Sequence, residues 1–428
     1  MSEPKAVQRS RALSSDESGR GAAFELESGW AQDSNASVMV ARNVRSLPNN
    51  VFSVMDARVD DAKERGIDVI DLSKANPDLP TPEFIVEAGQ QALEMIENQR
   101  YSQFDGKPAL LQAAQEWYRR EQGVELDWNS QLLATCGAGV ALTALTQTVL
   151  NPGDVLAVVD PYYPPYAALA QAAGAELLAI PCSQEQGFLP DFDTVSDEQW
   201  SRTKLLMLNY PNNPTGAVAS AQLFRQAIDL AHRHRFMVAN DFAYASLGEL
   251  PVRSAARGPA GLLSYAGSQD VAVEAVSLSK MYGMAGWRLG FIAGPSWLMQ
   301  YIREYHHQMC SSPTGAVQDA GTAALLSDQS SVERLSTRYA KRRSILSEGL
   351  EDVGIDVFHA SGALFVWAKA PHGMRGADFA DLLLDGAHVA VMPGDCFGVA
   401  GRDFVRFSLL DDELRLKECV RRIRALDL

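Results

Sequence analysis

Seven short apolar segments alternate with helical stretches between residues 131 and 294. The stretch SAQLFRQAIDLAHRH (220–234), for example, has helical spacing of its apolar residues. Strands that are apolar along their whole length are typical of a parallel sheet covered by helices on both faces. We therefore predict an α/β fold with a mainly parallel central sheet. The predicted strands are 131–136, 155–160, 175–180, 204–210, 235–241, 271–279 and 289–294.

The pattern changes after about residue 315. A long helical stretch (332–353) leads to short apolar segments and a terminal helix, which is typical of an α+β arrangement. The predicted short strands are 363–369, 389–394 and 404–410.

The length of the chain, 428 residues, is too great for one small core and suits two domains. Residues 1–35 are polar and lack periodicity, so we expect a disordered tail there. We expect a large domain over residues 80–335 and a small domain composed of residues 36–79 and 336–428.

Charge and cysteine content exclude several classes of function. A net charge of −15 argues against nucleic acid or an anionic membrane as the main partner. No apolar run is long enough to span a bilayer, and the N-terminus lacks a signal-peptide core. The five cysteines are scattered without CxxC spacing, and the histidines lack metal-ligand spacing, so we expect reduced thiols, a cytoplasmic protein and no metal.

Lys280 follows a strand-like apolar run and precedes three glycines in the stretch VSLSKMYGMAGWRLG (276–290). A lysine held near the interior is partly desolvated, which disfavours the ammonium form and makes the free amine available as a nucleophile. This setting suits Schiff-base chemistry. The alternative is a lysine that extends from a strand end to solvent, and the stretch alone does not decide between the two.

Other predicted strands also end in residues that suit an anionic, pyridine-type cofactor, and such ligands collect at the carboxyl ends of strands. Gly137, Ala138 and Gly139 precede a helix and allow backbone N–H groups to approach a phosphate, although a simple turn is the alternative. The prolines of NYPNNPTG (209–216) force an irregular path that can direct an amide inward. Asp241 ends an apolar strand, where a carboxylate needs a cation such as a protonated ring nitrogen.

Four segments, in this order, resemble the class I/II aminotransferases, which are fold-type I enzymes of pyridoxal 5′-phosphate (PLP). They are NNPTG (212–216), DFAY (241–244), SLSKMYGMAGWRLG (277–290) and RFS (406–408). The resemblance covers roughly residues 40–428. It implies that the large domain binds PLP.

The resemblance implies three catalytic residues. Lys280 would form the internal aldimine with PLP and, as a free amine, move the proton between the substrate α-carbon and the cofactor. Asp241 would pair with the pyridinium nitrogen. Tyr244, together with Asn213, would hydrogen-bond the ring oxygen.

The resemblance also implies contacts to the remaining parts of the cofactor. Tyr163 would stack on the ring, unless it only packs in the core. Ser277 and Arg288 would hold the phosphate together with the backbone of Ala138 and Gly139. Ser279 is a further candidate, and the alternative for Ser277 is that it caps a turn.

On the substrate side, the resemblance implies that Arg406 grips the α-carboxylate, where a planar guanidinium binds bidentately. Its alternative is a surface ion pair on an ordinary edge strand. Asn213 would also contact the substrate. Ala75 would do so through its backbone, although glycine is usual at this position and the methyl narrows the space. Tyr101 would reach a phosphate in the neighbouring subunit, which implies a homodimer with shared active sites.

The function implied is transfer of an amino group from an L-amino acid to a 2-oxo acid by a ping-pong route. Another PLP reaction on the same scaffold, such as β-elimination, cyclisation or oxidation, is the alternative. A regulator that uses the fold to bind an effector is disfavoured, because 35 polar N-terminal residues are too few for a helix-turn-helix domain.

Overall fold

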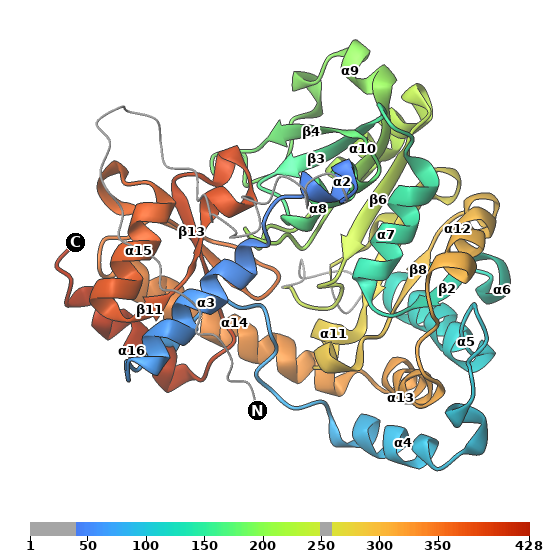
Figure 1. Cartoon of the computed structure of the whole chain (residues 1–428), viewed down its shortest axis with the longest axis horizontal. Helices are drawn as coiled ribbons and strands as arrows, with labels where there is room; N and C mark the ends of the chain where they lie inside the picture. The colour runs from blue at the N-terminus through green and yellow to red at the C-terminus, as the bar shows by residue number, and fades with distance from the viewer. Residues whose placement is uncertain (1–39, 249–258) are drawn as a thin grey trace, which may run out of the picture. The chain divides into compact units, whose positions relative to one another are not determined.

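The computed structural model describes residues 40–248 and 259–428, so the tail predicted over residues 1–35 lies outside the described residues. Residues Met1–Ser46 and Leu47–Leu428 form two separate units. The described part of the first contains α2 (Arg42–Arg45). The other helices and strands of the described residues lie in the second unit, and many of them are labelled in Figure 1.

A seven-stranded sheet forms the larger part of the second unit, in the order β2-β8-β7-β6-β5-β3-β4. Strands β3 to β7 pair in parallel, and β8 is antiparallel to both of its neighbours. The α/β fold with a mainly parallel sheet is therefore confirmed. The strands are β2 (Leu132–Thr135), β3 (Val155–Asp160), β4 (Glu176–Pro181), β5 (Thr203–Leu208), β6 (Met237–Phe242), β7 (Ala272–Ser277) and β8 (Gly290–Ala293).

Helices cover both faces of this sheet, as its apolar strands require. Leu133 packs in one buried cluster with residues of α7 (Ala138–Val149), α8 (Pro165–Ala172) and α12 (Ser296–Met309). Its neighbours Leu132 and Ala134 point to the other face. There they join a cluster with residues of α5 (Pro108–Trp117), α10 (Ala221–His234) and α13 (Gly315–Leu326).

Two smaller sheets contain the remaining strands. β12 (Met392–Pro393), β13 (Phe404–Ser408), β10 (Phe365–Lys369) and β9 (Val357–Phe358) form an antiparallel sheet in that order. β1 (Ile70–Asp71) pairs in parallel with β11 (Val389–Ala390). The single strand predicted over 389–394 is therefore wrong: it divides at Val391, because its first half pairs with β1 and its second half with β13.

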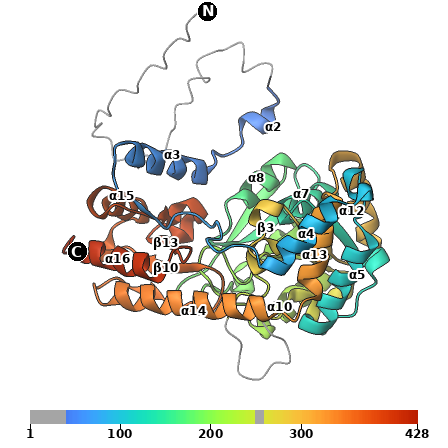
Figure 2. The ribbon, with the colours of Figure 1, turned by 90° about the horizontal axis from the view of Figure 1, so that it is seen from below.

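Long helices surround the four-stranded sheet. Figure 2 shows β10 and β13 between α3 (Val51–Glu64) and α14 (Ser330–Glu351), with α15 (Gly376–Ala387) and α16 (Glu413–Arg424) nearby. α14 runs through the predicted domain boundary at residues 335/336, and the division into a large and a small domain stays a prediction. The remaining α-helices of the described part of the chain are α4 (Glu83–Leu93), α6 (Trp128–Gln131), α9 (Asp197–Arg202) and α11 (Leu278–Met281).

No helix within residues 40–248 and 259–428 combines the length and the apolar character needed to cross a membrane.

Glu274 is a fully buried carboxyl group in the middle of β7. Its Oε2 accepts a hydrogen bond from the Tyr118 hydroxyl at 2.9 Å, and its Oε1 accepts one from the Leu263 N–H at 3.4 Å. Burial raises the pKa of Glu274 from 4.5 to about 7, although these hydrogen bonds oppose the shift.

We predict that Glu274 makes folding stability fall as the pH rises. Its folded pKa is raised, so the folded state holds a proton that the unfolded state releases above pH 4.5. This contribution is present below pH 4.5 and is lost as the pH rises through about 7. Urea unfolding at about pH 5 and about pH 8 should therefore show a smaller loss of stability in Glu274→Gln than in the wild type. An equal loss in both proteins would contradict the assignment.

Candidate active site

A cavity of about 610 Å³ lies where the strands of the large sheet end. It is lined by residues that follow β2, β3, β5, β6 and β7, and by residues of α3 and β13. All the predicted site residues line it except Tyr101. Those it brings together are Ala75, Ala138, Gly139, Tyr163, Asn213, Asp241, Tyr244, Ser277, Ser279, Lys280, Arg288 and Arg406.

Lys280 lies in the one-turn helix α11, three residues beyond the end of β7. The predicted strand over 271–279 was thus too long. Ser277 Oγ accepts the N–H of Ser279, and this cap starts a helical turn where the sequence indicated a loop. Lys280 Nζ donates to the carbonyl oxygen of Ala75. Burial lowers the pKa of Lys280 to about 8, and the nearby guanidinium groups of Arg406 and Arg288 add to the effect.

Asp241 is buried near the end of β6. Its Oδ2 accepts a hydrogen bond from the Tyr166 hydroxyl at 2.7 Å, and its Oδ1 is buried without a partner. Burial raises the pKa of Asp241 to about 6, while the Tyr166 bond acts in the opposite direction. A buried carboxylate oxygen without a donor fits the protonated nitrogen of a pyridine ring, so the residues present suit PLP.

Arg406 is fully buried on β13, an inner strand between β12 and β10. This placement contradicts the alternative of a surface ion pair on an edge strand. Nη1 donates to Asn213 Oδ1 at 2.8 Å and Nη2 donates to the Ser73 carbonyl oxygen at 2.6 Å. Nε has no partner, and burial lowers the pKa of Arg406 to about 10. The guanidinium can therefore receive an anion that enters the cavity.

Three aromatic rings surround this guanidinium. Its central carbon lies 4.3 Å from the ring centroid of Phe365, 4.9 Å from that of Phe397 and 5.7 Å from that of Phe52. Such contacts stabilise a cation that has lost its water. Tyr244 packs edge-on against Phe365, with 5.7 Å between the ring centroids, and burial raises its pKa.

The first turn of α7 and Arg288 form an anion-binding corner. Gly137 has φ +88°, and a Cβ at this position would lie 2.8 Å from Arg288 Nη2. The absence of a side chain therefore lets the guanidinium approach the helix N-terminus, where backbone N–H groups favour anions. Ser277 and Ser279 are buried in the same cavity. A phosphate group fits this combination of donors.

Tyr163 lies on the cavity wall and is not confined to the core. Its ring centroid is 6.2 Å from that of Phe52 and 5.6 Å from that of Tyr166. Tyr101, in contrast, is fully exposed and lies outside the cavity lining.

Sequence reasoning missed several residues of the site. Tyr166 and Asn209 had detectable signals, since each lies within four residues of a predicted position, Tyr163 or Asn213. Asn209 Oδ1 accepts the backbone N–H of Asn213, and its Nδ2 donates to the carbonyl oxygen of Asp241. Ser73, Lys74 and Asn76 had the same kind of signal, because they flank the predicted Ala75. Phe52, Asp56 and Met392 had none, because no predicted position lies within four residues of them in the sequence.

Across residues 40–248 and 259–428, no group of three or more His, Cys, Asp or Glu side chains is arranged to hold a metal ion.

Comparison with known proteins adds independent information. The family model for aminotransferase class I and II matches residues 67–423. The chain is 38% identical to the L-glutamine–4-(methylsulfanyl)-2-oxobutanoate aminotransferase of Bacillus subtilis (strain 168), over 90% of this chain and 96% of the relative. It is 34% identical to the LL-diaminopimelate aminotransferase of Aquifex aeolicus, over 90% and 98% of the two chains.

Solved structures show the same likeness in three dimensions. Substrate-bound BacF from Bacillus subtilis superimposes with a TM-score of 0.87 at 34% identity, over 91% of this chain and 98% of that chain. A single mutant of the aspartate aminotransferase of Thermus thermophilus gives a TM-score of 0.83 at 29% identity, over 90% and 99% of the two chains.

We predict that Tyr166 lowers the pKa of Asp241 by hydrogen bonding to its charged form. A hydrogen bond to an ionised group contributes about 1.5 to 3 kcal/mol. Tyr166→Phe should therefore raise the pKa of Asp241 by about one unit or more. The pKa of Asp241 is measured by carbon-13 NMR on cofactor-free protein with labelled aspartate. The Asp241 signal is identified as the one that is missing in Asp241→Asn. Tyr163→Phe is the matched control and should shift the titration far less; an unshifted Asp241 in Tyr166→Phe would show that the bond is unimportant.

Proposed function

Because this chain belongs to the class I and II aminotransferases, we propose that its cavity is the active site and that Lys280, Asp241 and Arg406 carry the reaction. The protein is a PLP-dependent aminotransferase, which moves an amino group from an amino acid to a 2-oxo acid. The observation that carries the proposal is the unpartnered Oδ1 of Asp241, buried in the same cavity as Lys280.

PLP, when bound, supplies a carbonyl group that combines with amines and a protonated ring that withdraws electrons. Asp241 holds the ring nitrogen protonated, and Tyr166 and Asn209 hold Asp241 in place. Ser277, Arg288 and the backbone of Ala138 and Gly139 hold the phosphate, with Ser279 beside them. Tyr163 covers one face of the ring.

Lys280 would hold the cofactor through its amine and, as a free amine, would move a proton at the α-carbon of the substrate. Its lowered pKa of about 8 leaves roughly a tenth of the amine in the free-base form at pH 7, far more than for a lysine with the ordinary pKa of 10.5. The hydrogen bond to the carbonyl oxygen of Ala75 holds the amine on the substrate side of the cavity.

Arg406 binds the substrate α-carboxylate, and its unpartnered Nε and the surrounding rings prepare it for an anion. Asn213 and Tyr244 line the same region of the cavity, where they would contact the ring oxygen of PLP, and Asn213 would also contact the substrate. Arg406 is fully buried, so its guanidinium has lost the water that would surround it at the surface. The substrate carboxylate would take the place of that water.

The amino donor is not fixed by the comparisons, because two relatives of similar identity are named for different substrates. The relatives are nevertheless named aminotransferases, which favours transamination over other PLP reactions. We also place the protein in the cytoplasm, because its described cysteines are free thiols, as a reducing compartment maintains them.

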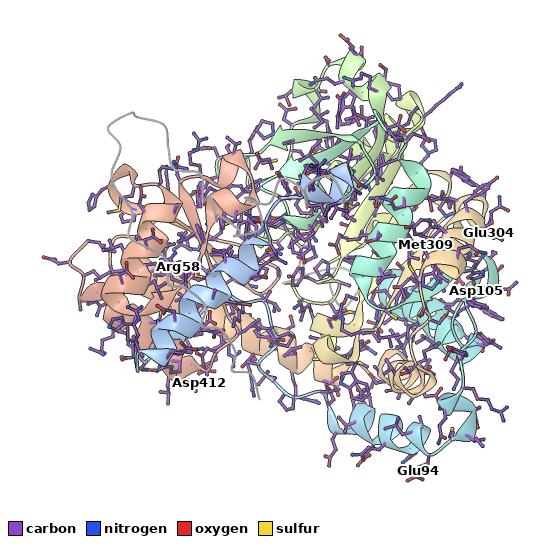
Figure 3. The ribbon with its side chains drawn as sticks, viewed as in Figure 1. Arg58, Glu94, Asp105, Glu304, Met309 and Asp412 are labelled. Carbon is purple, nitrogen blue, oxygen red and sulfur yellow. The ribbon has the colours of Figure 1, made fainter. Side chains whose placement is uncertain are left out.

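A homodimer with shared active sites is a further part of the proposal. Leu93, Met95, Ile96 and Phe104 are exposed apolar side chains close in sequence to Tyr101. Exposed apolar residues in such number indicate a protein–protein contact. Met309, at the end of α12, is a further exposed apolar side chain, with 67% of its surface accessible. Figure 3 labels Met309 and also Asp105, which follows Phe104 in the sequence. A contact over this surface would allow Tyr101 to reach the phosphate of the neighbouring site.

We also propose that residues 80–335 act as the PLP-binding domain and that 36–79 with 336–428 act as the small domain. Arg406 belongs to the second group and Lys280 to the first, so the cavity would lie between the two domains.

We predict that Lys280→Ala abolishes turnover and removes the visible absorbance of lysine-bound PLP, because the attaching amine is lost. Lys204→Ala is the matched control, since Lys204 is exposed on β5, and it should retain both properties.

For the wild type, an L-amino acid alone should consume the absorbance band and release a 2-oxo acid, and an added 2-oxo acid should restore the band. A band that survives every amino acid tested would refute transamination.

We predict that Tyr101→Ala and Lys280→Ala complement each other when mixed, unfolded and refolded together. Each mixed dimer would contain one site with both native residues, so part of the activity should return. Each variant refolded alone is the control and should stay severely impaired. A fully active monomer at assay concentration would rule out shared sites.

A further inference from the structure

An ion pair lies in the cavity wall and has no part in the proposed chemistry. Lys74 Nζ is 3.2 Å from Asp56 Oδ1 and 3.4 Å from Asp71 Oδ2. Asp56 and Lys74 both line the cavity. Their side chains are 46% and 39% exposed, so a molecule in the cavity can contact them.

The backbone holds Lys74 next to the reacting groups. The carbonyl oxygen of Ser73 accepts from Arg406, and that of Ala75 accepts from Lys280. Asp71 accepts the N–H and the hydroxyl of Ser73, at 3.2 and 2.6 Å. Lys74 therefore occupies a fixed position between the residue that binds the α-carboxylate and the residue that moves the proton.

Asp56 is equally well positioned, by helix α3. The side chain of Asn50 caps this helix by accepting the N–H groups of Phe52 and Ser53. Farther along the helix, Arg58, labelled in Figure 3, lies 2.7 Å from Asp381 of α15. The two contacts fix the start of the helix and its orientation.

The ion pair is within reach of a substrate side chain. Phe52 lies over Arg406, with 5.7 Å between the guanidinium carbon and the ring centroid. Asp56 follows Phe52 by one helical turn on the same face, which adds about 5–6 Å. An amino acid with its α-carboxylate at Arg406 therefore passes Phe52 and brings the end of a four- or five-carbon chain to Asp56 and Lys74.

The cluster is negatively charged, because Asp56 and Asp71 outnumber Lys74. Burial lowers the pKa of Lys74, but the hydrogen bond to Asp56 and the charge of Asp71 outweigh it, so the pKa is raised and the amine stays protonated. A second carboxylate on the substrate would accept from Lys74 but would meet the charge of Asp56. A carboxamide would accept from Lys74 and donate to Asp56 without adding charge.

We propose that Asp56 and Lys74 determine the substrate specificity of this enzyme by selecting the distal group of the amino donor. They favour a donor that ends in a carboxamide and reject one that ends in a second carboxylate. The inference rests on the proposed function for the position of the α-carboxylate at Arg406. Specificity of this kind depends on repulsion of the wrong ligand as well as attraction of the right one.

Binding of two unreactive analogues to the PLP-loaded enzyme tests the proposal. Glutarate and its monoamide, glutaramate, have the same length and lack an amino group, so calorimetry reports binding alone. The wild type should bind glutaramate about tenfold more tightly than glutarate, because like charges in contact are strongly unfavourable. Asp56→Asn should reduce this ratio to about threefold or less through tighter binding of glutarate.

Asp60→Asn is the matched control, because Asp60 is exposed on the same helix and lies outside the cavity lining. It removes the same charge and should leave the ratio unchanged. Lys74→Met should weaken glutaramate binding about tenfold or more, because a hydrogen bond from a charged donor is lost. Equal binding of the two analogues by the wild type, or a ratio that Asp56→Asn leaves as it was, would overturn the proposal.

Kinetics separate a failure of this inference from a failure of the proposed function. Glutamine, glutamate and methionine have side chains of similar length, and each is offered as the sole amino donor. The wild type should show a larger kcat/KM with glutamine than with glutamate, and Asp56→Asn should narrow the difference. Equal use of glutamine and glutamate would contradict the inference alone, whereas a protein inert to all three donors that still prefers glutaramate would contradict only the proposed function.

Discussion

The hydrogen bonds of the buried Arg406 side chain hold the site together. One joins β13 to the loop that follows β5, through Asn213, and another joins β13 to the segment before α4, through Ser73. These parts of the chain are far apart in sequence. A guanidinium without water is costly unless its donors are satisfied, so its burial requires all three segments to be in place. The guanidinium proposed to bind the substrate carboxylate and the cavity wall beside it therefore form together.

Burial shifts the pKa of three ionisable groups in the cavity so that the neutral form of each is favoured. The pKa of Asp241 is raised to about 6, and the pKa values of Lys280 and Arg406 are lowered to about 8 and about 10. Desolvation is the largest cause of each pKa shift, because burial disfavours the charged form of each group. A site of this kind is prepared for ligands that bring complementary charge. A ring nitrogen, a phosphate and a carboxylate meet that need at different points of the same cavity.

The segment 73–75 links this chemistry to specificity. Its carbonyl groups bind Arg406 and Lys280, while the side chain between them, Lys74, turns to Asp56 on α3. The residues proposed to react and the residues proposed to recognise the distal group are therefore positioned by one short stretch of backbone. A change at Asp56 or Lys74 can alter substrate preference without touching the groups that transfer the proton.

The amino-acid sequence by itself determined the central sheet and most of the residues at its carboxyl edge. Apolar strands must be covered on both faces, which fixes the fold class. The stretch around Lys280 did not by itself decide the role of that lysine, and the site residues followed from the combined resemblance of the segments 212–216, 241–244, 277–290 and 406–408. The approximate positions of all seven strands followed from periodicity, whereas the helical turn at Lys280 and the division at Val391 did not. A cap at Ser277 and a pairing partner such as β1 override local pattern.

Only the tertiary structure determined which side chains from other parts of the chain surround the predicted site residues. Tyr166 lies only three residues from the predicted Tyr163, yet its hydrogen bond to Asp241 depends on how the packing of α8 on β3 and β4 directs the Tyr166 side chain toward the end of β6. Phe52 and Asp56 lie on a helix whose sequence by itself indicates only packing. Lys74 is next to the predicted Ala75, but the sequence does not indicate that its side chain pairs with Asp56. They become part of the site because α3 and β1 pack beside β13, more than 300 residues later in the chain. Contacts between such distant segments depend on packing, and local sequence patterns do not encode them.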